Sequence, residues 1–150
     1  MDEFKYIRYE VADRVATITL DRADKANAQN ERMLDELDDR MRAAEADDEV
    51  GVIVLRGEGK HFSAGHDLQG GDADAVSLAE SDGSWHLNKI YRWEAKKYFG
   101  YGWYWRNSPK PTIAAVQGKA IAGALNLIWP MDLLVAADDM QLSDPVVLMA

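Results

Sequence analysis

One stretch, residues 112–132 (TIAAVQGKAIAGALNLIWPMD), constrains the fold of this chain more than any other. Its apolar run at 113–116 is bounded by Pro111 and Gly118, which predicts a strand buried on both faces. Small or aliphatic residues follow, and then a segment of helical length. A strand, a tight turn and a helix would leave free backbone N–H groups at the positive end of the helix dipole. Small side chains around Gly123 would let a ligand oxygen approach that backbone closely.

This turn has two interpretations, and a second loop bears on the choice between them. The turn could be half of an oxyanion hole, or it could belong to a strand, turn and helix that pack tightly for stability alone. Taken by itself, the stretch favours the second interpretation. Residues 61–68 (HFSAGHDL) directly follow another apolar run. Loops at the carboxyl ends of buried strands are where α/β proteins usually bind ligands. Two such turns could aim two backbone N–H groups at one oxygen.

Composition excludes several classes of function. A chain of 150 residues fits one domain with a real core, and its net charge of −9 argues against nucleic acid or an anionic membrane as the main partner. There is no cysteine, and the three histidines (His61, His66 and His86) lack metal-ligand spacing, so no metal site is expected. Without an apolar run of membrane-spanning length or a signal peptide, we expect a cytoplasmic enzyme or binding protein.

The first half of the chain alternates strands with a helix. Residues 4–10 and 15–20 predict a β-hairpin. An amphipathic helix follows, capped by either Asn27 or Asn30. The run at 50–55 predicts a further buried strand, and this order is typical of an α/β arrangement with crossovers. The apolar face of the helix comprises Met33, Leu34, Leu37, Met41 and Ala44.

The second half contains an aromatic-rich segment between loops and short strands. Residues 69–83 predict an exposed loop, and residues 85–105 predict a helix that is broken or frayed near Gly100 and Gly102. Most of the aromatic residues in that helix are expected in the core or at a subunit interface, with one or two lining an apolar substrate pocket. Residues 133–137 predict another buried strand.

The two small-residue loops together carry a family resemblance. HFSAGHDL and KPTIAAVQGKAIAGALNLIWPMDLLVAADDMQLSDP, with the earlier DRADKANAQN, resemble the crotonase family, the enoyl-CoA hydratase/isomerase superfamily. The resemblance implies an α/β fold of ββα repeats, the ClpP/crotonase-type spiral. It also implies that residues 1–150 form a single domain, incomplete at its C-terminus because the family continues into further helices. It implies a homo-oligomer as well, a trimer or hexamer.

The resemblance also implies a substrate and a set of site residues. Family members hold an acyl-CoA thioester between two backbone N–H groups, which here would belong to Ala64 and Gly123. Two such donors stabilise the enolate formed when a thioester reacts at its α or β carbon. Coenzyme A enters as part of the substrate, and no other cofactor is expected. The residues expected near the CoA nucleotide or its pantetheine arm are Lys25, Ala26, His66, Asp67 and Leu68.

The chain departs from the family pattern where the hydratases carry their two catalytic glutamates. Those positions are Asn126 and Val146 here, and neither side chain can act as a general base. Asn126 remains a candidate catalytic residue, because its amide could orient a water or the Asp144 carboxylate. Asp144 could be a relocated base, or it could cap the turn made with Pro145. We therefore expect an acyl-CoA-processing lyase or isomerase that is not a paired-glutamate hydratase. The alternative is a non-catalytic protein that binds acyl-CoA or another subunit.

Overall fold

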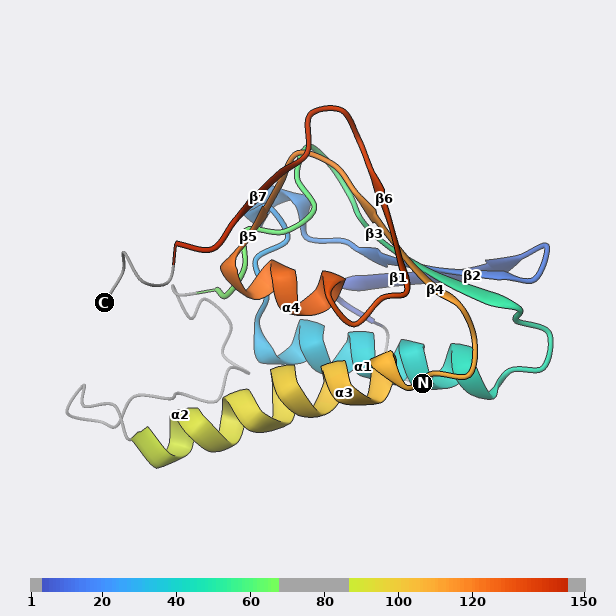
Figure 1. The fold of residues 1–150 in the computed structure, drawn as a ribbon, viewed down its shortest axis with the longest axis horizontal. Helices are drawn as coiled ribbons and strands as arrows, with labels where there is room; N and C mark the ends of the chain where they lie inside the picture. Colours follow the sequence, from blue (N-terminus) through green and yellow to red (C-terminus); the bar gives the residue numbers. More distant parts are fainter. Residues whose placement is uncertain (1–3, 68–86, 146–150) are drawn as a thin grey trace.

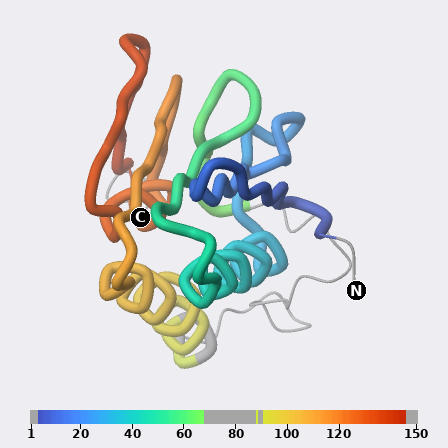
Figure 2. The backbone as a smooth tube through the Cα atoms, turned by 90° about the vertical axis from the view of Figure 1, so that its right-hand side faces the viewer, coloured from blue at the N-terminus to red at the C-terminus, as the bar shows by residue number. Residues whose placement is uncertain are grey.

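The computed structural model describes residues 4–67 and 87–145 as an α/β arrangement with all its longer helices on one side of a sheet (Figures 1 and 2). The larger sheet has the strand order β1-β2-β3-β4-β6, and β5 pairs with β7 in a second sheet. The strands are β1 (Ile7–Ala12), β2 (Val15–Leu20), β3 (Val52–Gly57), β4 (Thr112–Val116), β5 (Lys119–Ile121), β6 (Leu133–Ala136) and β7 (Gln141–Ser143). The helices are α1 (Glu31–Ala46), α2 (Leu87–Glu94), α3 (Tyr101–Arg106) and α4 (Leu125–Ile128), with short helical turns η1 (Ala23–Lys25), η2 (Ala95–Gly100) and η3 (Ala122–Ala124).

The predicted hairpin is confirmed, although its first strand begins later than expected. β1 and β2 pair antiparallel from Ile7↔Leu20 to Ala12↔Val15. The two residues between the strands, Asp13 and Arg14, have φ values of 49° and 65°. Two successive positive φ values are those of a type I′ turn, whose twist matches that of the strands that it joins.

Helix α1 covers the sheet with the face that its sequence predicts. Its five apolar residues named above are all buried, and the helix packs against β1, β2 and β3. Of the two candidate caps, Asn30 performs the role, since its side chain accepts a hydrogen bond of 2.9 Å from the Met33 N–H. Asn27 instead donates from Nδ2 to the carbonyls of Glu58, His61 and Phe62. It therefore ties the segment before α1 to the loop after β3.

Strands β2, β3, β4 and β6 run parallel, which brings the loops after β3 and β4 to one edge of the sheet. β4 is buried on alternate residues and half-buried between them, so the prediction of burial on both faces is wrong. β6 was expected to be buried, yet all four of its residues are exposed. β6 is the last strand of its sheet, and among the described residues only β4 pairs with it.

The aromatic segment forms one helical run, and the predicted break near Gly100 and Gly102 is absent. Residues 87–106 are helical throughout, with the π-helical segment η2 between α2 and α3. Gly100 has φ −64°, an ordinary helical value. The irregularity is therefore a widened turn rather than a gap, a feature often found at functional sites. Within it Tyr98 is buried, and further along Trp105 donates from Nε1 to Asp38 Oδ1 at 2.9 Å. None of the described helices is long and apolar enough to cross a membrane.

Candidate active site

The two small-residue loops meet, as the sequence predicts, and a glycine makes the contact possible. Ser63 and β5 exchange backbone hydrogen bonds, from the Ser63 N–H to Lys119 O at 3.2 Å and from the Ile121 N–H to Ser63 O at 3.1 Å. Gly65 has φ 87°, and a Cβ added there would lie 2.5 Å from Ile121 O and 3.2 Å from Gly123 N. The loop after β3 therefore lies directly against the turn that carries Gly123.

The free N–H group of the first loop belongs to His66 and not to Ala64. The Ala64 N–H donates to Ala26 O at 2.9 Å, so the prediction of a ligand donor at Ala64 is wrong. Gln29 pairs with the loop in parallel: its N–H donates to Gly65 O at 2.7 Å, and its carbonyl accepts from the Asp67 N–H at 2.9 Å. This pattern turns the His66 N–H away from Gln29. No described residue accepts a hydrogen bond from the N–H of His66 or of Gly123.

A buried polar network supports the Gly123 turn. The Tyr98 hydroxyl donates to Gln29 Oε1 at 2.7 Å, and Gln29 Nε2 donates to Ser63 Oγ at 2.9 Å. Ser63 Oγ in turn donates to Asn27 O at 2.8 Å. Burial, with a smaller contribution from the Glu94 charge, raises the pKa of Tyr98, which therefore keeps its proton and remains a donor. Sequence reasoning missed this network, because Gln29 and Tyr98 become neighbours only through the tertiary fold.

The His66 imidazole lies between this turn and an acidic side chain. A Cβ on Gly123 would lie 3.0 Å from Nδ1 of the ring. The ring packs against Tyr98 and Trp93, with centroids 4.6 and 5.8 Å away. Its Nε2 lies 3.1 Å from Glu94 Oε1, although the two atoms lack the alignment of a hydrogen bond. The imidazole thus separates Glu94 from the Gly123 turn by the width of one ring.

Two of the residues expected near CoA, Ala26 and Asp67, make structural contacts, and their contact with CoA remains a prediction. Arg22 Nη1 forms a 2.7 Å ion pair with Asp67 Oδ2 and a 2.9 Å hydrogen bond to Ala28 O, so the Asp67 carboxylate joins the loop after β3 to the segment before α1. Ala26 accepts the Ala64 N–H through its carbonyl. Lys25 is exposed on η1, and contact with CoA remains a prediction for it. Leu68 lies outside the described residues.

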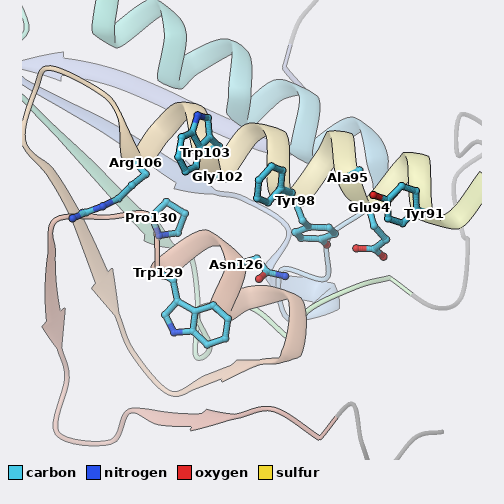
Figure 3. Close-up of a pocket in the computed structure, with 11 residues that line it drawn as sticks. Tyr91, Glu94, Ala95, Tyr98, Gly102, Trp103, Arg106, Asn126, Trp129 and Pro130 are labelled. Carbon is cyan, nitrogen blue, oxygen red and sulfur yellow. The ribbon is translucent and has the colours of Figure 1, made fainter.

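A pocket of 690 Å³ opens between the helical run 87–106 and α4. Glu94 projects from the helical run on the side that faces α4, and Asn126 points back from α4 (Figure 3). Arg106 at the rim pairs with Asp132 at 3.1 Å. Four aromatic residues of the helical run line the pocket, more than the one or two expected, namely Tyr91, Tyr98, Phe99 and Trp103. Trp129, directly after α4, lines it from the other side. Within the two described ranges, no group of three acidic or histidine side chains is placed to hold a metal ion.

Asp144 and the helix after Gly123 differ in part from expectation. Asp144 directly follows β7, whose pairing Ile121↔Ser143 brings it beside the Gly123 turn. Its side chain is exposed and is not among the residues that line the pocket, so a catalytic role for it remains a prediction. The helical residues after Ile121 span only η3 and α4 and end before Pro130, which leaves little helix dipole to act at the turn. Val146 lies outside the described residues.

Strain at the turn gives a prediction for stability. Ala122 has φ 47°, a left-handed conformation that costs a non-glycine residue about 1–2 kcal/mol. Ala122→Gly should raise the free energy of unfolding in urea titrations by up to about 1 kcal/mol, because the greater freedom of glycine in the unfolded chain offsets part of the relief. The matched control is Ala124→Gly, where φ is −63° and the free energy should fall by about 0.5–1 kcal/mol or more. Equal losses in both variants would contradict strain at Ala122.

Known proteins match this chain along nearly all of its length. The enoyl-CoA hydratase/isomerase family model matches residues 10–149. EchA13 of Mycobacterium tuberculosis, named as an enoyl-CoA hydratase, is 42% identical over 96% of this chain and 49% of its own. The 4-chlorobenzoyl coenzyme A dehalogenase-2 of an Arthrobacter species is 36% identical over 89% of this chain and 45% of its own.

A solved structure agrees with the sequence relatives. A protein described as an enoyl-CoA hydratase from Mycobacterium thermoresistibile superimposes with a TM-score of 0.84 and 53% identity, covering 96% of this chain and 54% of that one. The chain thus spans about half the length of the curated relatives that it matches. With the family model matched from residue 10 to 149 and a crotonase-type α/β fold, the chain belongs to the enoyl-CoA hydratase/isomerase family.

Proposed function

We propose that the chain binds an acyl-CoA thioester and stabilises its enolate between the backbone N–H groups of His66 and Gly123. The observation that carries this proposal is that these two N–H groups lack acceptors in the described part of the chain, on loops that Gly65 holds in contact. A thioester oxygen bound there would gain negative charge as a proton leaves the α carbon. Each donor to such an oxygen is worth about 2.7–4 kcal/mol in the transition state.

The pocket beside the turn is proposed to receive the acyl group. Asn126 contributes to its lining close to the Gly123 turn, and its other walls are mostly aromatic. Pockets of a few hundred Å³ with apolar walls and few polar groups are typical of small-molecule sites. One relative is named for a chlorobenzoyl thioester, which supports a cyclic acyl group as readily as a linear one. The reaction class that fits an enolate-stabilising site is lyase or isomerase, in a homo-oligomer as the family resemblance implies.

Hydration by paired glutamates is not part of this proposal. The Asn126 amide can orient a water or a substrate, but it cannot accept a proton at neutral pH. This observation favours a second candidate, a non-catalytic acyl-CoA-binding protein. The two candidates share the binding step and differ in turnover, so one set of measurements separates them.

The test uses crotonyl-CoA and phenylacetyl-CoA, with free CoA as the comparison. Calorimetry should show that both thioesters bind more tightly than CoA, and infrared difference spectra should show the thioester C=O stretch at a lower frequency when bound. Absence of thioester binding would overturn both candidates. Binding without the spectral shift would overturn the two-donor site, and hydration of crotonyl-CoA should stay well below the roughly 1–10³ per second of ordinary enzymes.

Gly123→Ala should abolish the spectral shift and reduce any turnover by about 10²–10³-fold, the loss seen when one oxyanion donor is removed. The added Cβ would lie 3.0–3.2 Å from His66 Nδ1, the Tyr98 hydroxyl and Gln29 Oε1, so the turn or these side chains must shift by a few tenths of an ångström. The control is Gly51→Ala, whose Cβ would meet nothing closer than 3.5 Å. An unchanged spectrum in Gly123→Ala would count against a donor at this position.

A further inference from the structure

The pocket contains an acidic side chain for which the family resemblance gives no role. Of the described residues that line the pocket, Glu94 is the only carboxylate. The other ionisable groups there are poor bases: Arg106 is a cation paired with Asp132, and the buried Tyr98 hydroxyl donates to Gln29. Tyr91 is exposed to solvent, and its phenol is a hydrogen-bonding group rather than a carboxylate. Glu94 is therefore the group in the pocket best suited to accept a proton.

Contacts around Glu94 connect it to the two free N–H groups. Glu94 Oε1 lies 3.1 Å from His66 Nε2, and the opposite ring nitrogen lies 3.0 Å from the position of a Cβ on Gly123. The His66 imidazole thus lies between the carboxylate and the turn and contacts both of them. An acyl thioester whose oxygen meets the Gly123 N–H extends its α carbon by two covalent bonds from that oxygen. For a general base to act, the Glu94 carboxylate must turn past the imidazole to within roughly 2.6–3.2 Å of the proton that it takes, or act through one water.

The surroundings of His66 explain why this carboxylate lies against the imidazole. The imidazole is held between the rings of Trp93 and Tyr98, and its Nε2 has almost no exposed surface. No described residue satisfies that nitrogen with an aligned hydrogen bond. Buried polar atoms without a hydrogen bond are costly, so a polar group close to Nε2 is favoured there. Glu94 Oε1, 3.1 Å away, is such a group. The side chain of Glu94 is 40% exposed at the pocket mouth, so it can shift between the imidazole and a bound substrate.

We propose that Glu94 is the general base that removes the α proton of the bound acyl thioester and returns it. This inference rests on the proposed function. One Glu94 oxygen takes the proton as the α C–H bond breaks. The electron pair of that bond forms the C=C of the enolate, and the carbonyl π pair moves to the oxygen between the His66 and Gly123 N–H groups. Return of the proton to the same carbon reverses the step, and no oxidant, reductant or metal ion takes part.

The experiment measures exchange of α protons for deuterium in phenylacetyl-CoA, by mass spectrometry in D₂O with the purified protein. This reaction reports the proposed step alone and requires no knowledge of the natural substrate. Wild-type protein should catalyse the exchange. Glu94→Gln should slow it by about 10²–10⁴-fold, the usual contribution of a general base, while the affinity for phenylacetyl-CoA measured by calorimetry stays within about twofold.

A rescue experiment separates catalysis from a purely structural role. Glu94→Ala with added sodium formate should regain exchange in proportion to formate, because a small carboxylate can enter the space left at the open pocket. The matched control is Glu49→Gln, an exposed glutamate after α1, which should exchange at the wild-type rate. Wild-type exchange in Glu94→Gln, or no formate rescue, would overturn the role of Glu94. Tight binding of phenylacetyl-CoA by wild-type protein without exchange would overturn it while leaving the proposed binding function in place, whereas absence of binding would overturn both.

Discussion

Arg22→Ala should lower the free energy of unfolding by about 3–5 kcal/mol, the usual cost of removing one partner from a buried ion pair. Arg22 and Asp67 meet at 2.7 Å with side chains only 9% and 10% exposed. The substitution removes the cation beside a buried carboxylate, and it also removes the hydrogen bond from Arg22 to Ala28 O. The ion pair joins the segment before α1 to the loop that carries His66, and the hydrogen bond holds that segment in shape. The loss of stability should therefore be accompanied by loosening of that loop.

The measurement is urea denaturation followed by circular dichroism, with hydrogen exchange at residues 63–67 as a local readout. Arg8→Ala is the matched control, because Arg8 also forms ion pairs, with Asp21 and Glu58, but is 53% exposed. Exposed pairs contribute about 0–1 kcal/mol. Similar losses in the two variants would show that burial does not distinguish the pairs. The double variant Arg22→Met/Asp67→Leu should recover part of the loss, because it leaves no charge to bury.

Much of the fold could be predicted from local patterns. The hairpin, the apolar face of α1 and the parallel strands follow from periodicity and turn chemistry, which act between residues close in sequence. The contact between the loops after β3 and β4 was also predictable, because adjacent parallel strands end at the same edge. The exposure of β6 was not predictable in this way. An apolar run indicates a strand, but whether it is covered depends on what packs against it, and its described neighbours leave it exposed.

The site shows the same division between local and tertiary determinants. The sequence predicts that small-residue turns supply free N–H groups, yet the N–H of Ala64 is taken by Ala26 and that of His66 is left open. This difference of two residues depends on how the segment near Gln29 pairs with the loop. Glu94 reaches the pocket because the helical run 87–106 packs beside α4, and no short-range pattern predicts that packing.

Gly65→Ala should have the largest combined effect on stability and function. Its φ of 87° costs an alanine about 1–2 kcal/mol, and the added Cβ would overlap Ile121 O at 2.5 Å, with a further cost of about 1–3 kcal/mol. The two nearest atoms, Ile121 O and Gly123 N, belong to the backbone of the facing loop and cannot rotate away. The two loops must therefore separate to relieve the clash. A displacement of about 1 Å at the N–H groups of His66 and Gly123 would reduce turnover or α-proton exchange by about 10²-fold.

The control Gly51→Ala separates this effect from the general cost of replacing a glycine. A Cβ at Gly51 would have its nearest contacts, 3.5 and 3.6 Å away, with atoms of Arg14, so that variant should keep both stability and exchange. Urea titration and the exchange assay, run on both variants, give the two readouts. If Gly65→Ala folds less stably but exchanges normally, the two loops need not be held in contact for catalysis. If it loses exchange far beyond its loss of folded protein, the distance between the two N–H groups is what the glycine maintains.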